Sequence, residues 1–145
     1  MVKENMEERT LLIIKPDAVA QRHIGSIIAM VEAKEFRILA MKMTRLDREQ
    51  AGTFYAVHRG KPFYEELLDF MTSGPIVPTA LSRRDGVSVL RQVVGATDSR
   101  EAAEGTMRSR FGSDGQRNAV HASDSPENAV REVAFFFGED EIFKD

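Results

Sequence analysis

The sequence contains no cysteine among its 145 residues, which excludes a disulfide framework and a thiolate metal site. It also contains no apolar run near the roughly 20 residues that a membrane-spanning helix needs. Residues 1–8 form a short polar N-terminal extension without the apolar core of a secretory signal. These absences predict a cytoplasmic protein with no membrane segment.

A strong basic excess is absent as well. The formal net charge is −3 and the pI is about 5.7, whereas a dedicated nucleic-acid-binding protein usually carries a clear positive charge. Nucleic acid is therefore not expected as a partner. The cations between Lys61 and Lys144 are all arginines, which suit phosphate better than lysines do but could equally lie on a solvated face. They are Arg83, Arg84, Arg91, Arg100, Arg108, Arg110, Arg117 and Arg131.

The common phosphate and metal motifs are missing too. Gly60-Lys61-Pro62 lacks the upstream glycine and the following hydroxyl residue of a P-loop, and no G-x-G-x-x-G occurs. The three histidines, His23, His58 and His121, do not have the spacing of a histidine-built metal site. His23 and His58 are expected to be ordinary surface histidines.

The composition is that of an ordinary globular protein, with 42% hydrophobic and 30% charged residues. A chain of this length fits one compact domain. Because no repeat, low-complexity tract or linker divides the sequence, we expect residues 1–145 to form a single domain.

Strand-like and helix-like segments alternate along the chain. Short apolar runs rich in β-branched residues predict strands, while apolar spacings of three and four with capping residues predict helices. The expected strands are 9–15, 36–43, 76–81 and 118–123, and the expected helices are 24–31, 47–57, 62–71, 87–94 and a segment from Ser125 onward. This order predicts an α/β (α+β) sandwich of the ferredoxin-like split βαβ type, in which helices on one face cover a four-stranded antiparallel sheet.

Some details of this pattern are specific enough to be tested. Pro78 cannot donate to a hydrogen-bond ladder, so its strand should lie at the sheet edge or be bulged there. Strict alternation places Phe36, Ile38 and Ala40 on the same face of their strand. Residues 95–117 have few apolar side chains and predict a long irregular connection that is functional or mobile.

His121 is the candidate for chemistry. It ends the last predicted strand, just before a capped helix. In an extended segment its side chain points to the same side as Ser123, and Glu132 on the next helix could turn back toward the imidazole. Taken by itself, His121 could equally be a structural histidine.

A histidine is well suited to carrying phosphate, because a neutral, nucleophilic ring nitrogen is available near pH 7. Cations must then gather around the transferring oxygens, because the transition state of phosphoryl transfer depends on positioning and charge neutralisation. Lys15, Arg91 and Arg108 are the candidates for this role.

Six separated motifs, in register from residue 9 to about 143, resemble those of the nucleoside diphosphate kinase family. Residues 118–125, Asn-Ala-Val-His-Ala-Ser-Asp-Ser, resemble the signature N-x-x-H-G-S-D-S. The others are Arg9-Thr10 with Ile14-Lys15-Pro16-Asp17-Ala18, Phe54-Tyr55 with Lys61-Pro62-Phe63, Ser73-Gly74-Pro75, Arg91 with Gly95-Ala96-Thr97, and Gly105-Thr106-Met107-Arg108.

The resemblance implies a phosphotransferase that moves the terminal phosphoryl group of a nucleoside triphosphate to a nucleoside diphosphate. The mechanism would be ping-pong, through a phosphohistidine at His121. Catalysis would also involve Lys15, Ser123 and Glu132. The implied nucleotide-binding residues are Lys15, Tyr55, Phe63, Arg91, Thr97, Arg108 and Asn118.

Phe63 would stack on the base, which explains tolerance for any base, although Tyr55 and Phe63 could also be core aromatics. The resemblance further implies Mg²⁺ held mainly by the nucleotide phosphates, so no protein metal ligand is expected. The expected partners are ATP and other nucleoside tri- and diphosphates. A homo-oligomer is expected as well, with a tetramer or dimer favoured over a hexamer because the tail after Phe143 is short.

The chain departs from the family pattern at several positions. Ala122 stands where the family usually has glycine, and a positive φ there would cost about 1 kcal/mol of strain. This departure favours the alternative, a nucleotide-binding regulatory module of the same fold with weak catalysis. Asp98-Ser99 replaces a common Asn-Pro, and residues 82–86 depart from the usual E-G-x-N/D-A/V, which leaves the docking of the helix at Val87 open.

Overall fold

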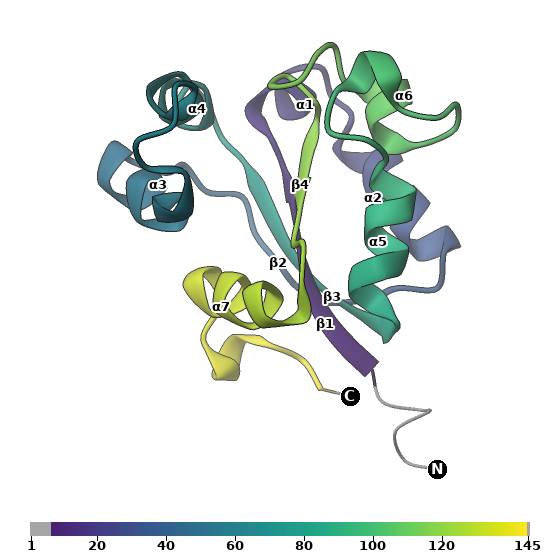
Figure 1. Cartoon of the computed structure of the whole chain (residues 1–145). Coiled ribbons are helices and arrows are strands. Elements are labelled where there is room, and N and C mark those ends of the chain that lie inside the picture. Colours follow the sequence, from purple (N-terminus) through teal and green to yellow (C-terminus); the bar gives the residue numbers. More distant parts are fainter. Residues whose placement is uncertain (1–6, 145) are drawn as a thin grey trace.

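The computed structural model describes residues 7–144 and contains one four-stranded sheet (Figure 1). The strand order is β2-β3-β1-β4, and every neighbouring pair is antiparallel. The strands are β1 (Glu7–Ile14), β2 (Arg37–Met41), β3 (Val77–Arg84) and β4 (Val120–Ala122). The predicted antiparallel sheet is confirmed. Its first strand begins two residues earlier than predicted, at Glu7 rather than Arg9, and residues 1–6 of the expected extension lie outside the described residues.

The helices fall close to the predicted segments, and their caps explain where two of them begin. The Asp47 side chain accepts from the backbone N–H of Gln50 to start α3, and Ser125 accepts from Asn128 to start α7. The α-helices are α1 (Pro16–Ala20), α2 (Ile24–Ala33), α3 (Arg48–Phe54), α4 (Tyr64–Met71), α5 (Gly86–Val94), α6 (Met107–Phe111) and α7 (Pro126–Phe136), and the 3₁₀ turns are η2 (Ala56–His58), η3 (Ser99–Glu101) and η4 (Glu139–Glu141). Every helix within residues 7–144 is too short or too polar to span a bilayer.

Helices cover both faces of the sheet, so the prediction of helices on one face was wrong. In Figure 1, α3, α4 and α7 lie on one side of the strands and α2 and α5 on the other. The reason lies in β1, whose apolar run is buried on both sides: Leu11 and Ile13 enter one core cluster, and Leu12 and Ile14 the other. A strand of this kind requires two helical layers.

Pro78 lies in the interior of the sheet, which contradicts the prediction of an edge strand or a bulge at that residue. Its carbonyl accepts from the Lys42 N–H at 3.2 Å, so its imide nitrogen faces the same side, toward β2. The missing donor interrupts the pairing only opposite Lys42, because pairing resumes at the antiparallel bridge between Thr44 and Ile76. The ladder toward β1 is undisturbed, with Pro78 opposite Ile13.

The bulge occurs instead in β2, where the register shifts between Ile38 and Ala40. Leu39 is the extra residue, and both Leu39 and Ala40 pack on the α7 side of the sheet. Ile38 packs on the α5 side. The prediction that Ala40 shares the face of Phe36 and Ile38 was therefore wrong, because one inserted residue reverses the alternation.

Helix α5 docks tightly on β1 despite the unusual sequence before it. The Glu8 side chain accepts from the Val87 N–H at 3.0 Å, and Asp85 adopts a φ of 55° to start the helix. A side chain at Gly86 would place its Cβ 2.7 Å from the Glu8 carbonyl oxygen. Glycine at this position therefore allows the close approach that docks α5.

Residues 95–117 contain more regular structure than predicted, namely η3 and α6. Thr106 caps α6 by accepting from the Ser109 N–H, and Gly95 lies against Thr106 with a φ of 93°. A Cβ at Gly95 would lie 2.6 Å from Thr106 Oγ1. The segment is thus an ordered connection, held by a close glycine–threonine contact.

Gly95→Ala is expected to destabilise the protein by about 3 kcal/mol, because it combines a strained φ with a steric overlap. Gly115→Ala is the matched control, since nothing lies within 4 Å of its added Cβ, and its effect should stay within about 0.5 kcal/mol. Urea unfolding at one fixed protein concentration measures both. Equal stability of the two variants would contradict the prediction.

Candidate active site

Strand β4 and helix α7 bring His121, Ser123 and Glu132 together, as the sequence predicted. His121 lies opposite Ile13 of β1, and its Nε2 is 2.8 Å from Glu132 Oε1. Ser123 Oγ donates to the same carboxylate oxygen at 2.6 Å. Ser123 is held in turn by β1, because its N–H donates to the Leu11 carbonyl at 3.1 Å. Strand β1, which is distant in sequence from β4 and α7, therefore helps to fix the orientation of the imidazole through Ser123 and Glu132.

The Glu132 carboxylate determines which nitrogen of His121 is free. Burial raises the pKa of Glu132, but the hydrogen bonds from His121 and Ser123, together with the charges of His121 and Arg131, outweigh it, so the pKa lies below the ordinary 4.5. An ionised carboxylate can only accept, so Nε2 must carry the proton and donate to Oε1. Nδ1 is the ring nitrogen that does not face this carboxylate.

Three cations predicted from the sequence lie around strand β4 and the residues just before it. Lys15 follows β1 directly, and Arg108 lies on α6; each is only 6% exposed. Arg108 donates through Nη1 to the Gly95 carbonyl at 3.1 Å and through Nη2 to the Val120 carbonyl at 2.8 Å. Arg91 of α5 reaches the Ala122 carbonyl at 3.5 Å. The backbone contacts of β4 thus draw two guanidinium groups toward His121.

Burial and mutual repulsion act on these cations. Burial, followed by the charge of Arg108, lowers the pKa of Lys15 from 10.5 to about 8, while Asp17 acts in the opposite direction. Burial and the charge of Arg91 lower the pKa of Arg108 to about 10. The Nε of Arg108 is buried with no partner among the described residues. An anion in this position would relieve both the repulsion and the missing hydrogen bond.

Asn118 connects Lys15 to the loops around the site. Its Oδ1 accepts from Lys15 Nζ at 2.8 Å. Its Nδ2 donates to the carbonyls of Thr97, at 2.9 Å, and Gly115, at 3.2 Å. Asn118 is buried, whereas Thr97, whose carbonyl it contacts, is exposed. The predicted nucleotide-binding role of Thr97 therefore depends on an exposed side chain.

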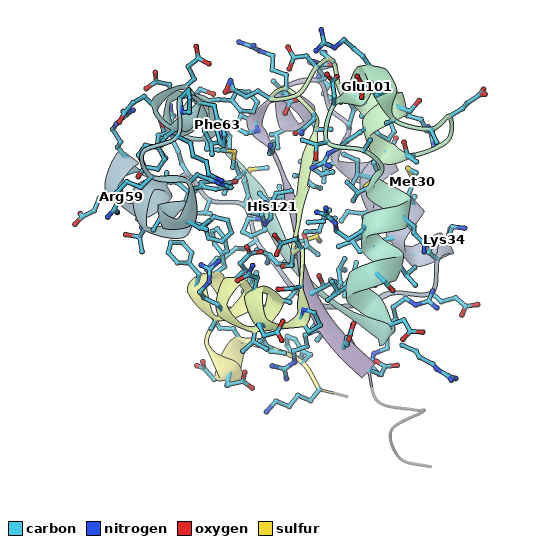
Figure 2. All side chains as sticks on the ribbon, viewed as in Figure 1. Met30, Lys34, Arg59, Phe63, Glu101 and His121 are labelled. Carbon is cyan, nitrogen blue, oxygen red and sulfur yellow. The ribbon has the colours of Figure 1, made fainter. Side chains whose placement is uncertain are left out.

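Aromatic side chains form one wall of the site. The rings of Phe54 and Tyr55 meet His121 edge-on, with centroids 5.4 and 6.0 Å away. Tyr55 is part of the core, yet its hydroxyl is buried with no partner among the described residues. Phe63 is 44% exposed, so it is not a core residue. In Figure 2, His121 lies near the middle of the molecule and Phe63 on the outer α3–α4 hairpin.

His58 belongs to this wall, although the sequence interpretation made it an ordinary surface histidine. Its ring stacks on Tyr55 at 6.1 Å and meets Phe63 edge-on at 5.3 Å. Burial, then the charges of Lys61 and His121, lower its pKa below 6.5. Its position between two predicted nucleotide-binding aromatics was the signal in the sequence that could have identified it.

The departure at Ala122 causes no backbone strain. Among residues 7–144 the non-glycine residues with positive φ are Arg22, Glu35, Asp85 and Ala119. Ala122 instead ends β4 as a buried strand residue paired with Leu12. Ala122 does not have the positive φ that would have strained the backbone next to His121. The one sequence feature that favoured a weakly catalytic module therefore no longer supports it.

A cleft of about 850 Å³ lies beside α1 and α4 and is distinct from the cluster around His121. Asp17, Asp69, Phe70 and Arg117 are among its lining residues, and none of the predicted site residues lines it. The candidate active site is therefore indicated by the convergence of a histidine, a carboxylate and three cations, and not by the size of a hollow.

Comparisons with known proteins agree with this geometry. The model of the nucleoside diphosphate kinase family matches residues 8–142. The nucleoside diphosphate kinases of Chlorobium luteolum and Staphylothermus marinus are each 52% identical to the chain over 137 and 135 residues, covering 94% and 93% of it and 98% and 96% of the relatives.

Solved structures extend the agreement to the fold. The Aquifex aeolicus nucleoside diphosphate kinase matches with a TM-score of 0.93 and 46% identity, over 94% of this chain and 99% of that one. The Halobacterium salinarum protein, solved in complex with CDP, also has a TM-score of 0.93, at 38% identity over 97% of this chain and 93% of that one. In motifs, sequence and fold alike, the chain belongs to the nucleoside diphosphate kinase family.

Proposed function

We propose that this chain, as a single domain over residues 1–145, transfers the terminal phosphoryl group of a nucleoside triphosphate to a nucleoside diphosphate through a phosphohistidine at His121. Membership of the family supports the activity. The observation that supports the role of His121 is the 2.8 Å hydrogen bond from Nε2 to Glu132. It leaves Nδ1 as the free nucleophile, beside Lys15, Arg91 and Arg108.

The reaction has two half-steps at the same nitrogen. In the first, Nδ1 attacks the terminal phosphorus, the bond to the bridging oxygen breaks, and the nucleoside diphosphate leaves with that oxygen. In the second, a terminal oxygen of another nucleoside diphosphate attacks the same phosphorus, and the P–N bond breaks to restore the imidazole. The Glu132 carboxylate stabilises the positive charge that develops on the ring during attack, and Ser123 orients that carboxylate.

The other site residues bind and orient the nucleotide. Lys15, Arg91 and Arg108 neutralise the phosphates, and the unpartnered Tyr55 hydroxyl is available to donate to them. Phe63, exposed on its hairpin, stacks on the base. Asn118 and Lys15 reach the sugar hydroxyls, and Thr97 contacts the phosphates.

Kinases of this family generally take their nucleotide together with a divalent metal ion, and we propose Mg²⁺ for this chain. Within residues 7–144, no three His, Cys, Asp or Glu side chains gather as a metal cage. This donor set fits an ion bound mainly by phosphate oxygens and water, which is the usual coordination of Mg²⁺. When bound, the ion would neutralise phosphate charge alongside the three cations.

We also propose a homo-oligomer, with a dimer or tetramer favoured over a hexamer. Within the described residues, β2 pairs with β3 on one side and has no strand on the other. Met41 and Met43 at this edge are 48% and 59% exposed. The Phe143 N–H donates to the Leu39 carbonyl at 3.0 Å, but no strand covers this edge within the described residues. A strand edge of this kind, flanked by exposed methionines, is typical of a surface that another chain covers.

His121→Ala should abolish phosphoprotein formation from labelled ATP and lower phosphoryl transfer by at least about 10³-fold, because the nucleophile is gone. The wild-type phosphoprotein should be acid-labile and alkali-stable and should discharge on addition of GDP, and ADP binding by the variant should persist. His23→Ala is the matched control and should label normally. Labelling that survives in His121→Ala would show that another residue carries the phosphate.

Raising the pH should weaken triphosphate binding above about pH 8. The buried Lys15 has its pKa lowered to about 8, so its charge is present below that pH and is lost as the pH rises through it. We therefore expect kcat/KM for MgATP to show an alkaline limb near pH 8. Lys15→Arg should remove the limb even where it slows the reaction, because arginine stays charged. A wild-type profile that is flat to about pH 9.5 would contradict this role of Lys15.

Sedimentation equilibrium should give the mass of two or four chains. A Met41→Asp, Met43→Asp double variant should shift the protein toward the monomer, because it places charge on the open edge of β2. A hexamer, or an assembly unaffected by the double variant, would contradict this proposal.

A further inference from the structure

Ala119, two residues before His121, has an unusual backbone conformation. Its φ is 75°, and the Val120 N–H donates to the Asn118 carbonyl at 2.8 Å across it. This combination is the strained γ-turn that L-residues rarely adopt. Ala119 is fully buried, so the surrounding structure must hold the turn in place.

The residues that follow β1 hold both polar backbone groups of Ala119. Its carbonyl accepts from the Lys15 N–H at 2.8 Å, and its N–H donates to Asp17 Oδ2 at 3.1 Å. The first contact comes from the backbone and is available to any residue at position 15. The second depends on the side chain of Asp17.

The turn determines where β4 begins and how its side chains are placed. Immediately before it lies Asn118, whose side chain binds Lys15. Immediately after it, Val120 pairs with Ile14, and His121 with Ile13. A change of conformation at Ala119 would therefore move the imidazole relative to the Lys15 ammonium.

We propose that Asp17 is a positioning residue for phosphoryl transfer, which holds the strained turn at Ala119 so that His121 and Asn118 keep their places. The inference rests on the proposed role of His121. Asp17 does not belong to the cluster around the imidazole; it lies at the start of α1 and lines the separate cleft beside that helix.

Asp17 has a second contact that must be separated from the first. Its charge interacts with Lys15, which lowers the pKa of Asp17, although burial raises it more. A substitution could thus act through the hydrogen bond to Ala119 or through the charge near Lys15. Asp17→Ala removes both, whereas Asp17→Asn removes the charge but keeps an acceptor oxygen of the same reach.

The test measures single-turnover phosphorylation of His121 by saturating MgATP, together with ADP affinity. Asp17→Ala should slow phosphorylation by at least about tenfold, since small misplacements of reacting groups are costly, and ADP affinity should change by less than about threefold. Asp17→Asn should be slowed by no more than about threefold. Asp69→Asn is the matched control: it removes an exposed carboxylate from the same cleft without touching the turn, and it should react like the wild type.

Rescue supplies the decisive comparison. Glycine adopts a positive φ without strain, so Ala119→Gly in the Asp17→Ala background should recover the rate by at least about threefold. The same change in the wild-type background supplies the fourth corner of the double-mutant cycle. A residue that only supports the fold would lower stability without this recovery of rate at unchanged ADP affinity.

Several results would overturn the proposal. They are a wild-type rate in Asp17→Ala, equal slowing in Asp17→Ala and Asp17→Asn, or no recovery with Ala119→Gly. If Asp17→Ala does not fold, Asp17→Asn with and without Ala119→Gly replaces it, and slowing without recovery then overturns the proposal. Wild-type protein that does not label at His121 would instead contradict the proposed function itself.

Discussion

The structure depends on β1, which is buried on both faces and paired along both edges. Its four consecutive apolar residues 11–14 are completely buried, so the strand joins two helical layers while β3 and β4 bind its edges. Lys15 follows the last residue of β1 directly, so its side chain is buried next to this central strand. The pairing of β4 with the end of β1 then brings His121 to the same place. A hydrophobic constraint in one strand thereby determines where the polar chemistry occurs.

The charges at this place are arranged for an anion. Lys15 and Arg108 are buried, which lowers the pKa of each; the charge of Arg108 further lowers the pKa of Lys15, and the charge of Arg91 that of Arg108. Hydrogen bonds to backbone carbonyls hold both guanidinium groups, so little reorganisation is needed when phosphate oxygens arrive. One carboxylate, Glu132, is directed at the imidazole on its Nε2 side. The carboxylate therefore lies on one side of the imidazole ring, while the cations lie around the backbone of the strand that carries the ring.

The sequence predicted much of this arrangement from local signals. The apolar run of β1, the caps Asp47 and Ser125, and the spacing of His121 and Ser123 are local properties, and the structure agrees with each. Predictions failed where a neighbour decided the outcome. Pro78 is acceptable in the interior because its carbonyl still accepts from Lys42 and pairing resumes two residues further on, at Thr44 and Ile76. Ala40 changes face because of a bulge that the sequence of β2 does not predict. His58 belongs to the aromatic wall because the connection between α3 and α4 places its ring between those of Tyr55 and Phe63.

The sequence by itself determined which segments become strands and helices, and it supplied the histidine, the carboxylate and the arginines in a recognisable order. Residue type and spacing suffice for these, because backbone geometry and burial of apolar side chains act over a few residues. Only the tertiary structure decided which imidazole nitrogen faces Glu132, which cations lie around β4, and that a strained turn at Ala119 is held by Asp17. Those properties depend on distances between groups as far apart in the chain as residues 17 and 119, and such distances exist only once the sheet has assembled.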